Sequence, residues 1–350
     1  MVKPNRPVFV VLNARSGRGD IRDRIETLRQ GFLAASGQAP RLFVARSGKR
    51  VPEIARAAVE QARQEDGVLV VSGGDGTINA VGQLALARQV PFGIIPGGTF
   101  NLLSRTHDIP QDVEGAIRTI VSGRVRAVQA GLVNDRVFFV NASLGLYPRL
   151  LEDREAYKRR LGRSRLVALW SALVTLFTRS YRLDLALAAD GREWKQRTPT
   201  LFVGNNRLQL DQVGIEEADC LERGRLLALT SEPLDTLAAI RLLARGALGR
   251  LGEAPEVHAF SFQRLVVGST RPTTRSRVKV ATDGEIVSLT LPLEFRPSPH
   301  ALQLIVPDDA AAAGLESEES RPGRSGSADA PMDTGLPTAA RIGDATAMPR

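Results

Sequence analysis

Short apolar runs alternate with helix-like patterns over residues 6–125, and this alternation restricts the fold of the chain more than any other feature. The apolar runs are strand candidates and lie at residues 8–12, 41–44, 68–71 and 92–95. The helix candidates are residues 20–36, 51–64, 77–88 and 111–122. Strands that are apolar throughout and separated by helices predict a parallel sheet with helices on both faces. Such sheets bind ligands at the carboxyl ends of their strands.

A different pattern begins after Gly123. Short strand candidates follow one another, and dipeptides that favour tight turns join some of them, as at Asn134-Asp135 and Asp190-Gly191. Helical stretches near 154–178 and 234–249 interrupt the strands. We therefore predict a mostly antiparallel β-sandwich in this part of the chain.

These patterns divide the 350 residues into three parts. We expect residues 1–125 to form an α/β domain and residues 126–307 to form a β-sandwich domain. Residues 308–350 are rich in Ala, Gly, Ser, Pro and acidic residues and have few large apolar side chains. Such a segment cannot bury enough apolar surface to offset the entropy lost on ordering, so we expect a disordered tail.

The charge and cysteine content of the chain limit the kinds of partner it can bind and the cellular compartment in which we expect it. A formal net charge of +9 suits an anionic partner, which can be a nucleotide, a nucleic acid or an acidic membrane surface. The single cysteine, Cys220, cannot form an internal disulfide. The longest apolar run, 166–177, is too short to span a bilayer, and the N-terminus has no signal-peptide pattern. We therefore expect a cytoplasmic protein.

A glycine loop at residues 73–77 (Gly-Gly-Asp-Gly-Thr) carries the first chemical signal. It follows the apolar run 68–71 and opens a helix candidate. Glycines allow the backbone to approach a ligand closely, and the N–H groups at a helix N-terminus attract anions. Asp75 supplies a carboxylate of the kind that binds Mg²⁺ carried by a nucleotide. We predict a phosphate-binding loop, and the alternative is a tight turn in which Thr77 caps the helix.

Two further loops follow neighbouring strands of the predicted sheet. Residues 97–101 (Gly-Gly-Thr-Phe-Asn) come after the run 92–95, and residues 13–19 (Asn-Ala-Arg-Ser-Gly-Arg-Gly) come after the first strand. Parallel strands would place all three loops at one rim of the sheet. None of them has the Gly-Lys-Ser/Thr ending of a Walker A loop or the dinucleotide-binding glycine pattern. Backbone amides, Mg²⁺ and Arg15 or Arg18 are then expected to balance the phosphate charge.

Taken together, five segments resemble the motif set of the diacylglycerol kinase catalytic family. In chain order they are residues 13–17, 73–77 and 97–101, Val140-Asn141 with Gly145, and Asp283-Gly284-Glu285. The resemblance extends over residues 6–306. It implies a first domain like those of phosphofructokinase and NAD kinase, a β-sandwich second domain, and a cleft where ATP meets a lipid. It further implies transfer of the γ-phosphoryl group to the hydroxyl of diacylglycerol or a related lipid, as in phospholipid biosynthesis.

The resemblance also implies which residues form the site. Residues of the three loops would bind ATP, namely Asn13, Ser16, Gly17, Gly73, Gly74, Asp75, Gly76, Thr77, Asn79, Gly97, Gly98, Thr99 and Asn101. Asp283 would be the general base, although Asp-Gly between two β runs is also an ordinary hairpin turn. Asp75 would hold the Mg²⁺ that accompanies ATP. Glu285 would either assist the same ion or be merely exposed.

Two positions depart from the pattern of the family. Leu102 follows Asn101 where members usually have Asp, and Arg223 stands where many bacterial members have an Asp that helps to bind a structural Mg²⁺. An arginine cannot ligate a cation, because its guanidinium offers only donors and a positive charge. We therefore predict that the structural Mg²⁺ is missing and that a salt bridge from Arg223 takes its place.

Residues 154–182 are strongly basic and surround an apolar run that contains Trp170. Such a helix suits the surface of an anionic bilayer, or it packs its apolar stripe on the β domain and leaves its charges in water. We expect ATP and a lipid as partners, peripheral contact with the inner face of the membrane, and no nucleic acid. The pattern does not specify the acceptor lipid or the oligomeric state.

Two other functions stay open on the sequence alone. NAD kinase shares the Gly-Gly-Asp-Gly-Thr loop, although Asp283-Gly284-Glu285 and residues 96–101 argue against it. A non-catalytic member of the fold that binds a nucleotide or a lipid is the other alternative. The departures at Leu102 and Arg223 are the support for that reading.

Overall fold

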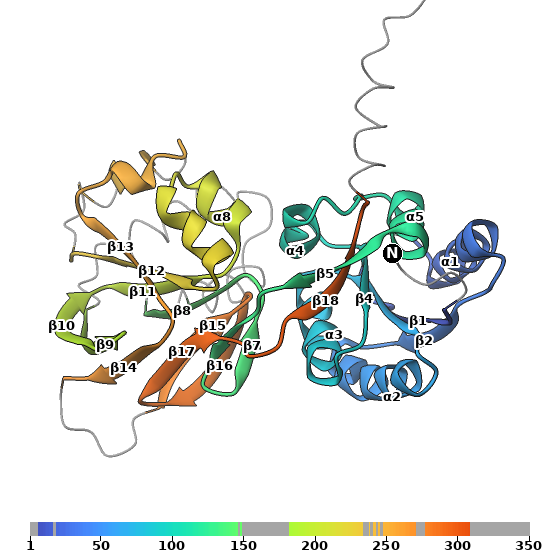
Figure 1. The fold of residues 1–350 in the computed structure, drawn as a ribbon, viewed down its shortest axis with the longest axis horizontal. Coiled ribbons are helices and arrows are strands. Elements are labelled where there is room, and N and C mark those ends of the chain that lie inside the picture. Colours follow the sequence, from blue (N-terminus) through green and yellow to red (C-terminus); the bar gives the residue numbers. More distant parts are fainter. Residues whose placement is uncertain are drawn as a thin grey trace, which may run out of the picture. The chain divides into compact units, whose positions relative to one another are not determined.

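Figure 1 shows the computed structural model of the chain, which describes residues 6–16, 19–145, 148, 182–233, 238, 241–242, 244–245, 248–270 and 277–308. Residues up to Asp308 belong to one compact unit. The predicted disordered tail beyond Asp308 and the basic segment 154–182, except Arg182, lie outside the described residues. No helix within the described ranges is long and apolar enough to cross a membrane.

The first sheet has six strands in the order β2-β1-β3-β4-β18-β5. Four of them form the predicted parallel core: β1 (Val8–Asn13), β2 (Arg41–Ala45), β3 (Val68–Gly73) and β4 (Phe92–Pro96). The other two are β18 (Leu302–Val306), which is parallel to β4, and β5 (Arg124–Val128), which is antiparallel to β18. The sheet is therefore mostly parallel, as the sequence predicted.

Helices cover both faces of this sheet (Figure 1). They are α1 (Ile21–Ser36), α2 (Val51–Gln64), α3 (Asp75–Arg88), the short α4 (Leu102–Thr106) and α5 (Val113–Ser122), with a 3₁₀ turn η1 (Gly48–Arg50) before α2. Alternate residues of β1 enter two separate cores. Val10 packs with Phe32 of α1 on one face, and Phe9 packs with Val59 of α2 on the other. The uniformly apolar strands are explained by this burial on both sides.

Strand β18 comes from the end of the described chain and returns to the first sheet. Leu302 and Leu304 are fully buried in one core of this sheet, and Ile305 is buried in the other. The sequence assigned these residues to the second domain, because a short apolar strand does not reveal its partner. The three-part division remains a prediction, but β18 pairs with β4 and β5 rather than with the β-sandwich.

The remaining described residues form two antiparallel six-stranded sheets, ordered β10-β9-β14-β17-β6-β7 and β13-β12-β11-β8-β15-β16. Strands of the first are β6 (Gly131–Val133), β7 (Arg136–Phe138), β9 (Leu183–Ala189), β10 (Arg192–Thr198), β14 (Leu265–Ser269) and β17 (Leu293–Pro297). Strands of the second are β8 (Asn141–Gly145), β11 (Thr200–Gly204), β12 (Leu226–Ser231), β13 (Val257–Phe262), β15 (Arg277–Thr282) and β16 (Glu285–Thr290).

These two sheets share one apolar core, which contains Leu187 and Phe295 from one sheet and Leu144 and Leu201 from the other. The predicted β-sandwich is thus confirmed, and so are its turns. Asn134 turns the chain between β6 and β7 with a φ of 53°, which is the left-handed conformation that Asn tolerates. Helix α8 (Arg207–Gln212) and the 3₁₀ helices η2 (Glu216–Arg223) and η3 (Leu251–Glu253) lie among the later strands.

Burial of β18 predicts that its apolar side chains stabilise the first sheet. Leu304→Ala should lower the free energy of unfolding by about 2–5 kcal/mol, because it leaves a cavity in the core that the sheet shares with α2 and α3. Gln303→Ala, on the same strand but only partly buried, should cost roughly 0.5 kcal/mol or less. Chemical denaturation measures both values, and equal costs would show that β18 contributes little to the core.

Candidate active site

Two glycine loops meet at the carboxyl ends of β3 and β4. The N–H group of Gly97 donates to the carbonyl oxygen of Gly73 over 2.9 Å. A Cβ atom placed on Gly98 would lie 2.8 Å from the Cα of Gly74, which is closer than real Cβ contacts. The loops therefore touch backbone to backbone, and the glycines at 74 and 98 are explained by this close approach.

The loop after β1 is joined to the same rim by a buried hydrogen bond. The side-chain amide of Asn13 donates to the hydroxyl of Thr77 over 2.9 Å. The side-chain oxygen of Asn13 in turn accepts from the backbone N–H of Arg15 over 3.0 Å. The structure thus brings the three predicted loops together. Gly17 and Arg18, which we expected to contact phosphate, lie outside the described residues.

Asp75 links the two glycine loops through its carboxylate. One oxygen accepts from the N–H of Asn101 over 3.0 Å, and the other accepts from the N–H of Leu102 over 2.8 Å. The carboxylate therefore caps the N-terminus of α4, where a negative charge is favourable. Because Leu102 contributes its backbone N–H, its departure from the family pattern does not remove this contact. A carboxylate has about four lone-pair sites, so Asp75 keeps acceptor capacity for a ligand.

Asn101 folds the second glycine loop. Its backbone is left-handed, with a φ of 49°, and its side-chain oxygen accepts from the N–H of Gly98 over 2.9 Å. Its side-chain amide donates to the carbonyl oxygen of Gly98 and to Gln111. The buried side chain of Asn101 is thus engaged within the protein. These bonds explain how the loop keeps its shape, and the contact of Asn101 with ATP stays a prediction.

A pocket of about 780 Å³ opens over these loops. It is lined by seven residues that the sequence predicted for ATP binding, namely Ser16, Gly74, Asp75, Gly76, Thr77, Gly98 and Thr99. The other lining residues are Gly48, Val51, Pro52, Arg56, Ala80, Gln83, Leu84, Phe100, Arg136 and Glu285. Most of these lie on ordinary helical or strand patterns, which carry no local signal for binding. The volume is in the usual range for a small-molecule site.

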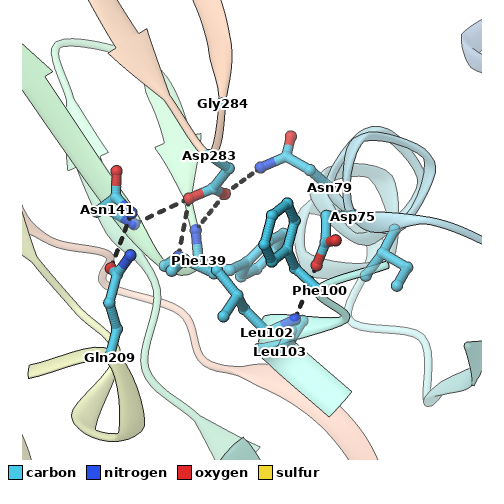
Figure 2. Close-up of a pocket in the computed structure, with 12 residues that line it drawn as sticks. Asp75, Asn79, Phe100, Leu102, Leu103, Phe139, Asn141, Gln209, Asp283 and Gly284 are labelled. Carbon is cyan, nitrogen blue, oxygen red and sulfur yellow. Dashed lines mark hydrogen bonds between the residues drawn. The ribbon is translucent and has the colours of Figure 1, made fainter. Parts of the chain in front are cut away.

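Asp283 occupies the turn between β15 and β16, where its φ is 46°. Figure 2 shows its carboxylate between β8 and α3. The N–H groups of Phe139, Val140 and Asn141 donate to it over 2.7, 2.9 and 3.0 Å, and the side-chain amide of Asn79 also donates to it. Burial raises the pKa of the Asp283 carboxyl above its ordinary value, and the hydrogen bonds act in the opposite direction.

Asn79 lies beside Asp283 rather than in the larger pocket. Its side-chain oxygen accepts a hydrogen bond from the amide of Gln83, one turn further along α3. This contact orients the Asn79 amide so that its N–H points toward Asp283 (Figure 2). The structure makes Asn79 a neighbour of the predicted base, and its contact with a nucleotide stays a prediction.

A second pocket of about 160 Å³ surrounds the Asp283 carboxylate. Its apolar lining comes from Ile78, Phe100, Leu102, Leu103, Phe139 and Val140, and its polar lining from Asp75, Asn79, Asn141, Gln209, Asp283 and Gly284. Asp75 and Phe100 line both pockets. The glycine loops and the predicted base therefore face adjoining spaces that meet at these two residues.

Glu285 and Arg136 form an ion pair over the first glycine loop. Nη2 of Arg136 lies 2.9 Å from Oε2 of Glu285. A Cβ atom on Gly76 would lie 3.7 Å from the other oxygen of Glu285. The sequence singled out Glu285 but not Arg136, whose place in β7 looks like that of any strand residue. The pair contributes two charged side chains to the larger pocket.

The charges near Arg223 differ from the prediction. Arg207 of α8 makes the ion pairs here, with Asp219 at 2.8 Å, Asp211 at 3.4 Å, and Glu222. Two acids of η2, Asp219 and Glu222, are thus paired with an arginine of an earlier helix, and the predicted salt bridge from Arg223 was wrong. Among the described residues no group of three or more His, Cys, Asp or Glu side chains is arranged to hold a metal ion.

The contact between the glycine loops predicts that the loop packing is sensitive to a single methyl group. Gly98→Ala should lower the free energy of unfolding by about 1–3 kcal/mol, because the new Cβ meets the backbone of Gly74 and the side chain of Asn101. Gly48→Ala is the matched control, since nothing lies within 4 Å of a Cβ there, and it should not destabilise the protein. Thermal and chemical unfolding measure both, and a neutral Gly98→Ala would contradict the packing argument.

Comparisons with known proteins agree with this geometry. Residues 7–133 match the model of the diacylglycerol kinase catalytic domain. An uncharacterized protein of Synechocystis is 24% identical over 307 residues, which cover 85% of this chain and 70% of that protein. A diacylglycerol kinase of Bacillus subtilis is 31% identical over 147 residues, which cover 41% of this chain and less than half, 47%, of that protein.

A crystal structure of a diacylglycerol kinase from Bacillus anthracis has the same fold. Its TM-score is 0.61 at 17% sequence identity, and the match covers 87% of this chain and 98% of that chain. At this identity the likeness concerns the fold alone. Residues 7–133, which carry the glycine loops, thus match the diacylglycerol kinase catalytic domain family, and 87% of the chain shares the fold of that Bacillus anthracis protein.

Proposed function

We propose that this protein is an ATP-dependent lipid kinase that transfers the γ-phosphoryl group of ATP to a hydroxyl of diacylglycerol or a related lipid. The observation that carries the proposal is the position of Asp283, in a largely apolar pocket that adjoins the loop-lined pocket. An apolar lining suits a lipid better than the polar ribose of NAD, so it favours a lipid kinase over NAD kinase. The name of the Bacillus subtilis relative supports the same activity.

ATP would place its phosphates against the glycine loops. The N-terminus of α3 offers backbone N–H groups to an anion there, and Ser16, Thr77 and Thr99 add hydroxyl groups to the lining. Mg²⁺ commonly binds through one or two carboxylates together with the phosphates of its nucleotide, and the free acceptor capacity of Asp75 fits that requirement. The ion would neutralise charge that develops on the phosphates.

Asp283 would take the proton of the acceptor hydroxyl. Its four lone-pair sites are filled by three backbone N–H groups and the Asn79 amide, so we propose that the hydroxyl displaces Asn79. The hydroxyl oxygen then forms a bond to the γ-phosphorus, the bond from that phosphorus to the bridging oxygen breaks, and ADP leaves. The hydroxyl proton passes to Asp283, whose raised pKa makes it a stronger base than an ordinary aspartate.

Positioning would supply most of the catalysis, because phosphoryl transfer requires alignment and charge stabilisation more than reactive side chains. Phe100 lines both pockets, and its side chain is 57% exposed. Bound reactants that pack against this ring would shield it from water and be shielded by it. We also propose that the protein works in the cytoplasm and meets its lipid at the membrane surface. The segment 154–182, which carried the prediction of membrane contact, lies largely outside the described residues.

Asp283→Asn should lower phosphoryl transfer by about 100-fold or more, because an amide cannot accept the hydroxyl proton. Radiolabelled ATP with Mg²⁺ and a panel of diacylglycerol, monoacylglycerol, sphingoid bases, phosphatidylglycerol and NAD measures the transfer and identifies the acceptor. Asp135→Asn is the matched control, since Asp135 is exposed on the hairpin turn between β6 and β7 and lines neither pocket.

Each outcome of this assay has a distinct meaning. Label in a lipid that disappears in Asp283→Asn supports the kinase with Asp283 as base. Lipid label that persists would move that role to Asp75, the other carboxylate lining the smaller pocket. Label in NAD alone would identify an NAD kinase, and ATP binding without transfer to any acceptor would favour the non-catalytic alternative.

The raised pKa of Asp283 predicts the acidic limb of the pH profile. Asp283 accepts a proton only when ionised, so kcat/KM should fall as pH drops through a pKa above that of an ordinary aspartate. Asn79→Ala removes a hydrogen bond that favours the ionised form and should move this limb to higher pH. Gln64→Ala, an exposed amide of α2, should leave the profile unchanged. A limb that does not move in Asn79→Ala would exclude Asp283 as the titrating base.

A further inference from the structure

The larger pocket has few cations with which to bind a triphosphate. Its charged lining residues are Arg56, Asp75, Arg136 and Glu285, and its lining contains no lysine. The N-terminus of α3 carries a partial positive charge, but Asp75 in its first turn offsets it. Arg15, which the sequence suggested as a partner of phosphate, does not line this pocket. The positive charge that side chains bring to this pocket must therefore come from Arg56 or Arg136.

Arg136 is the arginine that the protein holds in a defined position. Its Nε–H donates to the hydroxyl of Thr282 over 3.1 Å, and its Nη2–H donates to Glu285 over 2.9 Å. Thr282 is buried, so it is a rigid partner. A guanidinium has five N–H groups, and among the described residues Nε and Nη2 make this anchor while Nη1 takes no part in it. Arg136 therefore has donors left for an anion in the pocket.

The β15–β16 hairpin that holds Arg136 in place also contains the predicted base, Asp283. Thr282, Asp283 and Glu285 belong to the turn between β15 and β16, so one turn holds both the guanidinium and the Asp283 carboxylate. Glu285 in turn lies beside Gly76 of the first glycine loop. Arg56 differs, because it is exposed on α2 and is not tied to this turn.

We infer that Arg136 binds the terminal phosphate of the nucleotide and that Thr282 and Glu285 are positioning residues that hold its guanidinium. The inference rests on the proposed function, since it takes ATP as the ligand. The terminal phosphate must reach the acceptor beside Asp283, and Arg136 is the pocket cation fixed to the Asp283 turn. A planar guanidinium binds two phosphate oxygens at once, which suits it to this task better than a lysine.

Binding of ATP and ADP to the full chain tests the assignment without any need for catalysis. Calorimetric titration with Mg²⁺-ATP and Mg²⁺-ADP gives the two Kd values for wild type and for each variant. Arg136→Ala should raise the Kd for ATP by about tenfold or more, as expected for loss of hydrogen bonds to a charged group. ADP lacks the terminal phosphate, so its Kd should rise much less. Arg136→Lys should fall between wild type and Arg136→Ala for ATP, because a lysine keeps the charge but not the fork.

Arg197→Ala is the matched control. Arg197 is also a strand arginine paired with a carboxylate, Asp184 at 2.8 Å, but it lies on β10 and lines neither pocket. It should leave both Kd values unchanged, and thermal unfolding confirms that each variant is folded. A ratio of ATP to ADP affinity that stays at the wild-type value in Arg136→Ala overturns the assignment to the terminal phosphate. Wild type that binds neither nucleotide overturns the proposed function itself, and the inference with it.

Discussion

Hydrogen bonds to the carboxylate of Asp283 connect the β-sandwich with helix α3, which covers the first sheet. Three backbone N–H groups at the start of β8 hold it from one side, and Asn79 of α3 holds it from the other. Because Asp283 sits on the β15–β16 turn, the same bonds position Glu285 and Arg136 over the first glycine loop. The arrangement of both pockets therefore depends on this partly buried acid.

The glycine loops are a second constraint, and they act through the backbone. Gly74 and Gly98 approach so closely that neither can carry a Cβ atom without displacing the other loop. Asp75 then ties the first loop to α4 through two backbone N–H groups. Asp75, which the family pattern links to Mg²⁺, therefore also holds the two loops together. Its remaining acceptor capacity allows both roles on one carboxylate.

Much of the fold could be predicted because its signals are local. Apolar strands separated by helices indicated the parallel sheet, and Asn134 and Asp190 marked hairpin turns at positions that do have a positive φ. The loops were recognisable from their glycines. The sheet that β18 joins and the ion pairs of Arg207 were not predicted, because a strand or a surface helix gives no indication of its partner in the sequence. Arg136 was missed for the same reason.

The sequence by itself determined which elements form and where the backbone of one loop can approach another segment closely, since periodicity and glycine content act over a few residues. Only the tertiary structure decided that β18 completes the first sheet, that Asn79 faces Asp283, and that an arginine of β7 overhangs the glycine loop. The glycine loop at residues 73–77 and the turn at Asp283 are some two hundred residues apart. Contacts over such separations depend on how whole sheets pack, which no local pattern records.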